Sequence, residues 1–323
     1  MSWFSKLFTN TAKPASAAMT LSPSTVGAAT PVFFVSHGGP TFMYSDKEGG
    51  IMGGDYGAFK TVRKIGQTIL QDIKPKFIVY VSAHWQSKAD NLIEVSVPKS
   101  FGKSGLENPL IYDFYGFPQY MYQEQFHSEC DISVANDIVN TINHSNTGLK
   151  AKLSERGIDH GVWVPLKIAF PNDDLVKNQI PLIQVSLTRN DYDFDSNFKL
   201  GELLAEYRSK GGVIIASGMT VHNLGDMRNP GPKPYNEEFT KLLNDILLTK
   251  QQNKLGKFKA ILQDAKQKEL LLKAHPSLEH FLPIIVALGA AEQNGDDVEK
   301  IKQLYNNSVE SLGWGIYQFG DLL

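Results

Sequence analysis

The chain has 323 residues, 42% of them hydrophobic, which is enough for one large folded core or two smaller ones. Its 32 lysines and arginines nearly balance its 34 aspartates and glutamates, and no long block of like charge is present, so we expect a small-molecule ligand and neither nucleic-acid nor membrane binding. Because Cys130 is the only cysteine, an intramolecular disulfide and a thiolate metal cluster are excluded, and any metal must have nitrogen or oxygen ligands. We interpret Cys130 as an inert buried thiol.

Residues 1–30 differ in composition from the rest of the chain. They contain Lys6 and Lys13, no acidic residue, and many serines, threonines and alanines. This composition is compatible with a mitochondrial presequence, but the segment lacks arginine. We therefore interpret it as a disordered leader on a cytoplasmic protein, with the presequence as the alternative.

After residue 30 the chain alternates apolar runs typical of strands with segments of helical periodicity. The predicted strands cover residues 31–36, 77–82, 180–187 and 213–217, and the predicted helices lie around residues 62–73, 134–142 and 198–207. This alternation predicts an α/β fold with a mostly parallel central sheet flanked by helices. Since no internal repeat or flexible linker interrupts residues 31–323, we expect a single domain.

Three further segments complete the prediction of the fold. Residues 49–54 are glycine-rich and predict a loop after the first strand. Residues 250–273 are charged and glutamine-rich, and we expect solvated helices inserted at the surface. Residues 315–319 predict a last strand at the edge of the sheet.

Three histidines each follow a predicted strand: His37, His84 and His222. In an α/β fold the carboxyl ends of parallel strands form one rim, where ligands bind, so these imidazoles are expected to meet around a single metal ion. A histidine at a strand end, taken alone, is more often a hydrogen-bonded turn residue than a metal ligand.

Two more histidines lie in distinctive passages. Ser277 is a plausible helix N-cap, which would make His280 project from the first helical turn, although a capping role for Glu279 or His280 is an alternative. His160 is expected on a loop, where Asp159 or a backbone carbonyl would orient it as a general base, unless it is simply a buried histidine. We interpret His127 and His144 as surface residues.

Six short passages, in this order along the chain, resemble the LigB-type extradiol ring-cleavage dioxygenases, in the branch that includes 4,5-DOPA dioxygenase. The passages are SHGGP, SAHW, DFYGFP, DHGVWVPL, SGMTVHNL and HPSLEHFLPIIVALGAA. The resemblance covers roughly residues 31–323 and implies that His37, His84 and His280 hold one divalent metal at the carboxyl ends of the strands. It further implies that His222 is a fourth ligand or an acid/base, and that His160 contacts substrate or oxygen.

The resemblance also bears on the metal and on the reaction. In the wider superfamily a glutamate stands where this chain has His280, and an all-imidazole site accepts Zn(II) as readily as Fe(II). Glu279 is adjacent, but consecutive helical residues point about 100° apart, so we expect only His280 to reach the ion. The implied activity is extradiol cleavage of a DOPA-like or other small catechol with O₂ to a semialdehyde.

Four aromatic residues are candidates for the walls of the substrate pocket, although each is also compatible with simple packing. They are Trp85, Phe114, Tyr115 and Trp163. Two other functions fit the same residues: a zinc-dependent hydrolase and a non-catalytic metal-binding scaffold. The sequence leaves the physiological substrate and the oligomeric state open.

Overall fold

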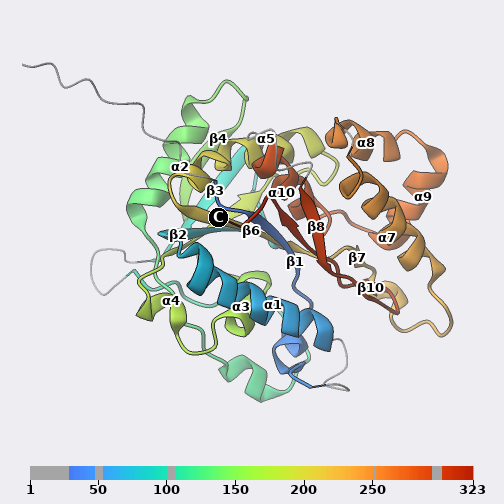
Figure 1. Cartoon of the computed structure of the whole chain (residues 1–323), viewed down its shortest axis with the longest axis horizontal. Coiled ribbons are helices and arrows are strands. Elements are labelled where there is room, and N and C mark those ends of the chain that lie inside the picture. The colour runs from blue at the N-terminus through green and yellow to red at the C-terminus, as the bar shows by residue number, and fades with distance from the viewer. Residues whose placement is uncertain (1–28, 48–53, 100–105, 251, 293–299, 323) are drawn as a thin grey trace, which may run out of the picture.

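The centre of the molecule is an eight-stranded sheet with the strand order β4-β3-β5-β2-β6-β1-β11-β8. The computed structural model describes residues 29–47, 54–99, 106–250, 252–292 and 300–322. The strands are β1 (Val32–Ser36), β2 (Phe77–Gln86), β3 (Leu92–Val97), β4 (Lys150–Glu155), β5 (Leu182–Leu187), β6 (Gly212–Gly218), β8 (Ile301–Tyr305) and β11 (Ile316–Phe319). Helices cover both faces of this sheet (Figure 1).

The four strands at the middle of the sheet, β5, β2, β6 and β1, are all parallel. On one side β3 and β4 are parallel to each other but β3 is antiparallel to β5, and on the other side β11 and β8 are antiparallel to their neighbours. The predicted single-domain α/β fold with a mostly parallel sheet is therefore confirmed. The prediction of an edge strand at residues 315–319 is wrong, because β11 lies between β1 and β8 and is buried along its length.

The parallel strands are apolar on both faces because helices pack against both. In β1, Val32 and Phe34 belong to the core on one face, and Phe33 and Val35 belong to the core on the other. Successive strand residues point to opposite faces, so an unbroken apolar run is what a doubly covered strand requires. The apolar run that predicted this strand thus reflects its central position.

One face of the sheet carries α1 (Tyr56–Thr68), α3 (His160–Ala169) and α4 (Asp174–Lys177), whose buried residues share one core. The other face carries α2 (Ile132–His144), α5 (Phe194–Leu204), α6 (Glu206–Ser209), α7 (Pro234–Leu247), α8 (Lys254–Ile261), α9 (Ala265–Ala274) and α10 (Leu282–Glu292). The helix predicted around residues 62–73 is α1 continued by a π-helical turn, Ile69–Ile73, which ends at left-handed Lys74. The helix predicted at residues 198–207 begins earlier and is divided into α5 and α6.

Helices α8 and α9 occupy the segment predicted as solvated surface helices. They are helical as predicted, but Phe258, Ile261 and Leu271 are buried in the shared core, so the segment is part of the domain. Cys130 is buried, as predicted, and burial raises the pKa of its thiol to about 12. His127 and His144 are exposed, as predicted.

A small three-stranded sheet lies beside the main one and is formed by β7 (Val221–His222), β10 (Leu312–Gly313) and β9 (Ser308–Val309). Its register places Leu312 opposite His222. The predicted leader falls mainly on residues 1–28, and most of the predicted glycine-rich loop falls on residues 48–53, both outside the described residues. Within the described ranges, no helix combines the length and apolarity needed to cross a membrane.

Candidate active site

Five histidines from five separate segments gather where the parallel strands end, and they are His37, His84, His160, His222 and His280. The His84 Nε2 atom lies 3.1 Å from Nε2 of His37 and 3.2 Å from Nε2 of His280. His37 directly follows β1, and His84 lies near the end of β2, which runs four residues beyond the predicted strand. Of the three strand-end histidines, His37 and His84 therefore meet as predicted, whereas the ring of His222 contacts that of His280.

Carboxylates on the far side of two rings set which nitrogen carries a proton. His280 Nδ1 donates a 2.8 Å hydrogen bond to Glu279 Oε1, and His84 Nδ1 lies 3.3 Å from Asp113 Oδ2. A neutral imidazole has one protonated nitrogen, so each Nε2 is left with a lone pair. These lone pairs face one another at about the 3.0–3.4 Å separation expected for two nitrogens bound about 2.0–2.1 Å from one ion.

The buried rings are held in the neutral form that binds metals. The pKa of His37 and that of His280 lie well below the ordinary value, first because burial disfavours the charged ring and then because other imidazoles are close. Neutral imidazoles with converging lone pairs repel one another unless a cation lies between them, so the donor set fits a divalent metal. The sets whose ligand atoms all lie within 4.8 Å of one another are His37, His84 and His160, and His222, Glu279 and His280.

Asp113 connects the cluster to His160 and was not recognised in the sequence. Its Oδ1 accepts a 2.9 Å hydrogen bond from the His160 backbone N–H and lies 2.9 Å from His160 Nδ1. Burial would raise the pKa of Asp113, but its contacts with His160 and His84 outweigh burial and hold that pKa far below the usual range. The only signal in the sequence was that an acid opens the otherwise aromatic passage DFYGFP.

The predicted surroundings of His160 are wrong in two respects. His160 begins helix α3 instead of lying on a loop, because the Asp159 carbonyl accepts hydrogen bonds from the backbone N–H groups of Val162 and Trp163. The Asp159 carboxylate does not orient His160 but accepts hydrogen bonds from Ser82 Oγ at 2.7 Å and from Gln184 Nε2. Asp159 therefore joins α3 to the sheet.

His280 also differs from its predicted position. Helix α10 begins at Leu282, so His280 lies in the turn before the helix and not in its first turn. The Leu278 carbonyl accepts hydrogen bonds from the backbone N–H groups of Phe281 and Leu282, and the His280 carbonyl accepts one from Met219. The end of β6 therefore positions this histidine directly.

His222 lies flat against His280. The ring centroids are 3.5 Å apart and the ring planes differ by 16°. The pKa of His222 is lowered to about 3, mainly by burial and further by His275. On the other side of the cluster, the centroids of His84 and His160 are 4.0 Å apart.

Four of the five histidines, all except the buried His37, line the floor of a cavity of about 500 Å³, within the range of small-molecule sites. Aromatic lining residues are Phe114, Tyr115 and Phe117, and aliphatic lining residues are Met219, Leu224, Met227 and Leu312. Phe114 and Tyr115 thus lie where the sequence interpretation put them, with Tyr115 88% exposed at the rim.

The two tryptophans proposed as pocket walls do not line this cavity. Trp163 is fully buried in the core behind Phe114, and its Nε1 donates a 3.0 Å hydrogen bond to the Ile111 carbonyl. Trp85 is buried, and the Arg156 guanidinium lies 4.8 Å from its ring centroid. Packing, the alternative interpretation, accounts for both residues.

A family model described as the catalytic LigB subunit of aromatic ring-opening dioxygenase matches residues 31–315. The chain belongs to the LigB family. The resemblance inferred from the six passages is thereby confirmed. In general terms, membership in the LigB family makes the chain an oxygenase that uses a metal, an aromatic substrate and O₂.

Individual relatives agree with this placement in the LigB family. The chain is 33% identical over 270 residues to a 4,5-DOPA dioxygenase extradiol-like protein of Schizosaccharomyces pombe, covering 80% of this chain and 84% of the relative. It is 30% identical to a 4,5-DOPA dioxygenase extradiol of Beta vulgaris, covering 89% of this chain and 95% of the relative. A solved structure of an uncharacterized protein from Escherichia coli K12 shares the fold, with a TM-score of 0.63, 22% identity and coverage of 90% of this chain and 100% of that one.

Proposed function

We propose that the chain is a metal-dependent dioxygenase that opens the ring of a small catechol by extradiol cleavage to a semialdehyde. The observation that carries this proposal is that the Nε2 atoms of His37 and His280 both lie within 3.2 Å of His84 Nε2, and that His84 and His280 line a cavity with aromatic walls. Membership in a family of ring-opening dioxygenases and the names of the relatives support it.

His37, His84 and His280 are the proposed ligands of one divalent ion, Fe(II) or Zn(II). When bound, Fe(II) supplies the redox chemistry with O₂ that ring opening requires and that Zn(II) lacks. Glu279 orients His280 and Asp113 orients His84, as carboxylates commonly orient histidine ligands from their outer nitrogen.

His222 is proposed as an acid/base and not as a fourth ligand. An imidazole lone pair lies in the plane of its ring, and the planes of His222 and His280 are nearly parallel with centroids 3.5 Å apart. The lone pairs of His222 would therefore not be directed at an ion that His280 holds. From this position His222 lines the cavity and can exchange a proton with a bound aromatic substrate.

His160 is proposed as the second proton-transfer group. Its Nδ1 faces Asp113, so the neutral ring presents the lone pair of Nε2, which accepts a proton from a substrate hydroxyl. Burial lowers the pKa of His160, as does His84, whereas Asp113 opposes that shift. General acid–base catalysis of this kind contributes about 10²–10⁴-fold to a rate.

The test is to load metal-free protein with Fe(II) under argon, add a panel of catechols that includes DOPA, and then admit air. We expect a yellow semialdehyde and one O₂ consumed per ring opened, with no product from the Zn(II)-loaded protein. Product formation without O₂ would support a zinc-dependent hydrolase instead. Metal binding without turnover of any catechol would support a non-catalytic scaffold.

A further inference from the structure

The cavity above the histidine cluster has no permanently cationic wall residue among the part of the chain that the structure describes. Its polar side chains are the imidazoles, Thr41, Asp113 and the phenol of Tyr115, which lies at the exposed rim. The Asp113 carboxylate is already engaged by His84 and His160, and it adds negative charge to the site. A substrate carboxylate would therefore find no lysine or arginine partner in the described walls.

The remaining walls are apolar on both sides of the cluster. Beside His160, the Phe114 ring stands edge-on to the imidazole with centroids 5.8 Å apart, and Phe117 packs on Phe114. On the other side, Leu312 is the cross-strand neighbour of His222, and Leu224 lies two residues after His222 in the chain. A ring substituent that extends from the floor therefore meets aromatic or aliphatic surface.

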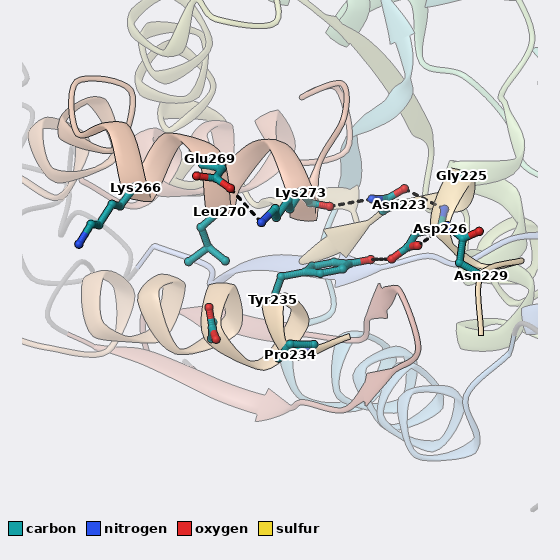
Figure 2. Close-up of a pocket in the computed structure, with 11 residues that line it drawn as sticks. Asn223, Gly225, Asp226, Asn229, Pro234, Tyr235, Lys266, Glu269, Leu270 and Lys273 are labelled. Atoms are coloured by element: carbon teal, nitrogen blue, oxygen red, sulfur yellow. Dashed lines mark hydrogen bonds and ion pairs between the residues drawn. The ribbon is translucent and has the colours of Figure 1, made fainter. Parts of the chain in front are cut away.

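The segment after β7 contributes apolar side chains to the wall of this cavity. It contains a short 3₁₀ helix, Leu224–Asp226, which turns Leu224 and Met227 toward the active-site cavity. Asp226 instead lines a second groove between this segment, α7 and α9 (Figure 2). One short segment thus presents apolar side chains to the active site and polar ones to a separate surface.

No lysine or arginine of the described part of this neighbourhood lines the active-site cavity, and two of the lysines, Lys266 and Lys273, line the second groove instead. Lys273 pairs with Glu269 at 2.9 Å, and Asp226 Oδ2 accepts a 2.9 Å hydrogen bond from the Tyr235 hydroxyl, as Figure 2 shows. Asn223 ties the two sides of the groove together by donating a 2.8 Å hydrogen bond to the Lys273 carbonyl. These groups have partners of their own and do not line the active-site cavity.

We propose that the substrate is an ortho-dihydroxy aromatic with an uncharged, mainly apolar substituent, and that the amino acid DOPA is disfavoured. Placing a carboxylate against apolar walls and near Asp113 removes its hydration without a compensating partner, whereas an alkyl substituent gains from leaving water. The cavity volume of about 500 Å³ leaves room for such a substituent beside the ring. The inference rests on the proposed function, the ring opening of a catechol, and concerns only which ring substituent the cavity binds.

The test separates binding from turnover. Protein loaded with Zn(II), which binds ligands without redox chemistry, is titrated by calorimetry with four catechols: 4-ethylcatechol, dopamine, 3-(3,4-dihydroxyphenyl)propionate and DOPA. We expect 4-ethylcatechol to bind at least ~10-fold more tightly than either carboxylate-bearing catechol. Equal or tighter binding of DOPA would overturn the inference.

A matched pair of variants tests whether the selectivity against carboxylates arises because the described cavity walls contain no cation. Leu224 is 56% exposed at the cavity, so Leu224→Arg adds a cation at the rim with little risk to folding, and Leu224→Gln is the uncharged polar control. We expect Leu224→Arg to raise the affinity for the propionate relative to 4-ethylcatechol several-fold, and Leu224→Gln to leave that ratio near the wild-type value. The same ratio in both variants would contradict the role assigned to charge.

Turnover of the same four catechols by the Fe(II)-loaded protein distinguishes the two proposals. If 4-ethylcatechol binds preferentially but no catechol is opened, the recognition inference stands and the proposed function fails. If all four are bound and opened equally well, the proposed function stands and the recognition inference fails.

Discussion

His84 serves different partners with its two ring nitrogens, and this distinguishes it from His160. Its Nε2 faces His37 and His280, and its Nδ1 faces Asp113, whereas His160 contacts Asp113 from the wall of the cavity. Substitution of His84, a proposed ligand, should therefore have a different effect from substitution of His160, a proposed proton-transfer residue, even though the two rings are adjacent.

We predict that His84→Ala loses the bound metal, whereas His160→Ala keeps it and loses turnover by about 10²–10⁴-fold. The measurements are metal content by elemental analysis and O₂ uptake with a catechol. His127→Ala, at an exposed histidine, is the control. Equal metal content in the wild type and His84→Ala would refute the ligand assignment.

Glu279 is a positioning residue for His280, since its carboxylate accepts the hydrogen bond from Nδ1. We predict that Glu279→Ala lowers metal affinity by about 10–100-fold, because the His280 ring loses its orientation and some basicity. Competition with a chelator measures this affinity. Glu269→Ala, which removes an exposed carboxylate paired with Lys273, should bind metal like the wild type. An unchanged affinity in Glu279→Ala would exclude the positioning role.

At the scale of elements, helices α5 and α10 approach each other closely at two glycines. A Cβ atom on Gly201 would overlap the carbonyl oxygen of Val286, and one on Gly289 would overlap that of Phe198. Backbone atoms on both sides leave no flexible side chain to move aside. The loop before α10 carries His280, so this contact also fixes the helix that follows a proposed ligand.

We predict that Gly201→Ala lowers the free energy of unfolding by roughly 1–3 kcal/mol, because overpacking against a carbonyl outweighs the better helix propensity of alanine. Lys199→Ala, at a partly exposed position of the same helix, controls for propensity without the clash. Denaturant unfolding of both variants measures the difference. Stability equal to that of the wild type in Gly201→Ala would show that the helices can separate at no cost.

The sequence predicted those elements that combine an apolar run with a clear period. It did not predict β3 and β4. Strand β4 (KAKLSE) has few apolar residues and is largely exposed at the sheet edge, whereas the apolar run of β3 (LIEVSV) is interrupted by Glu94 and Ser96. It also misplaced the starts of α3 and α10 relative to His160 and His280, since backbone hydrogen bonds decide those boundaries.

At the scale of the whole molecule, the proposed metal joins segments far apart in the chain. His84 and His280 are 196 residues apart, and their Nε2 atoms are 3.2 Å apart. A metal that binds the folded site and not the unfolded chain stabilises the fold by linkage.

We predict that Zn(II) raises the melting temperature of metal-free protein, with roughly 2.7 kcal/mol of stabilisation when free metal is 100 times its Kd. A chelator should reverse the shift, and Mg²⁺, which prefers oxygen ligands, should produce none. Differential scanning calorimetry measures the change. His84→Ala should melt at the same temperature with and without Zn(II), and a full Zn(II) shift in that variant would place the ion elsewhere.

By itself the sequence determined the α/β class and the delivery of His37 and His84 to one rim, because strand periodicity and the residue that follows a strand are local properties. It also indicated membership in the LigB family, since the six passages and their order are properties of the chain itself. Only the tertiary structure decided that Asp113 and Glu279 are the partners of the imidazoles, that His222 stacks on His280, and that neither Trp85 nor Trp163 faces the cavity. The physical reason is that these facts depend on the direction of side chains from separate elements, which packing in three dimensions sets and which spacing along the chain does not encode.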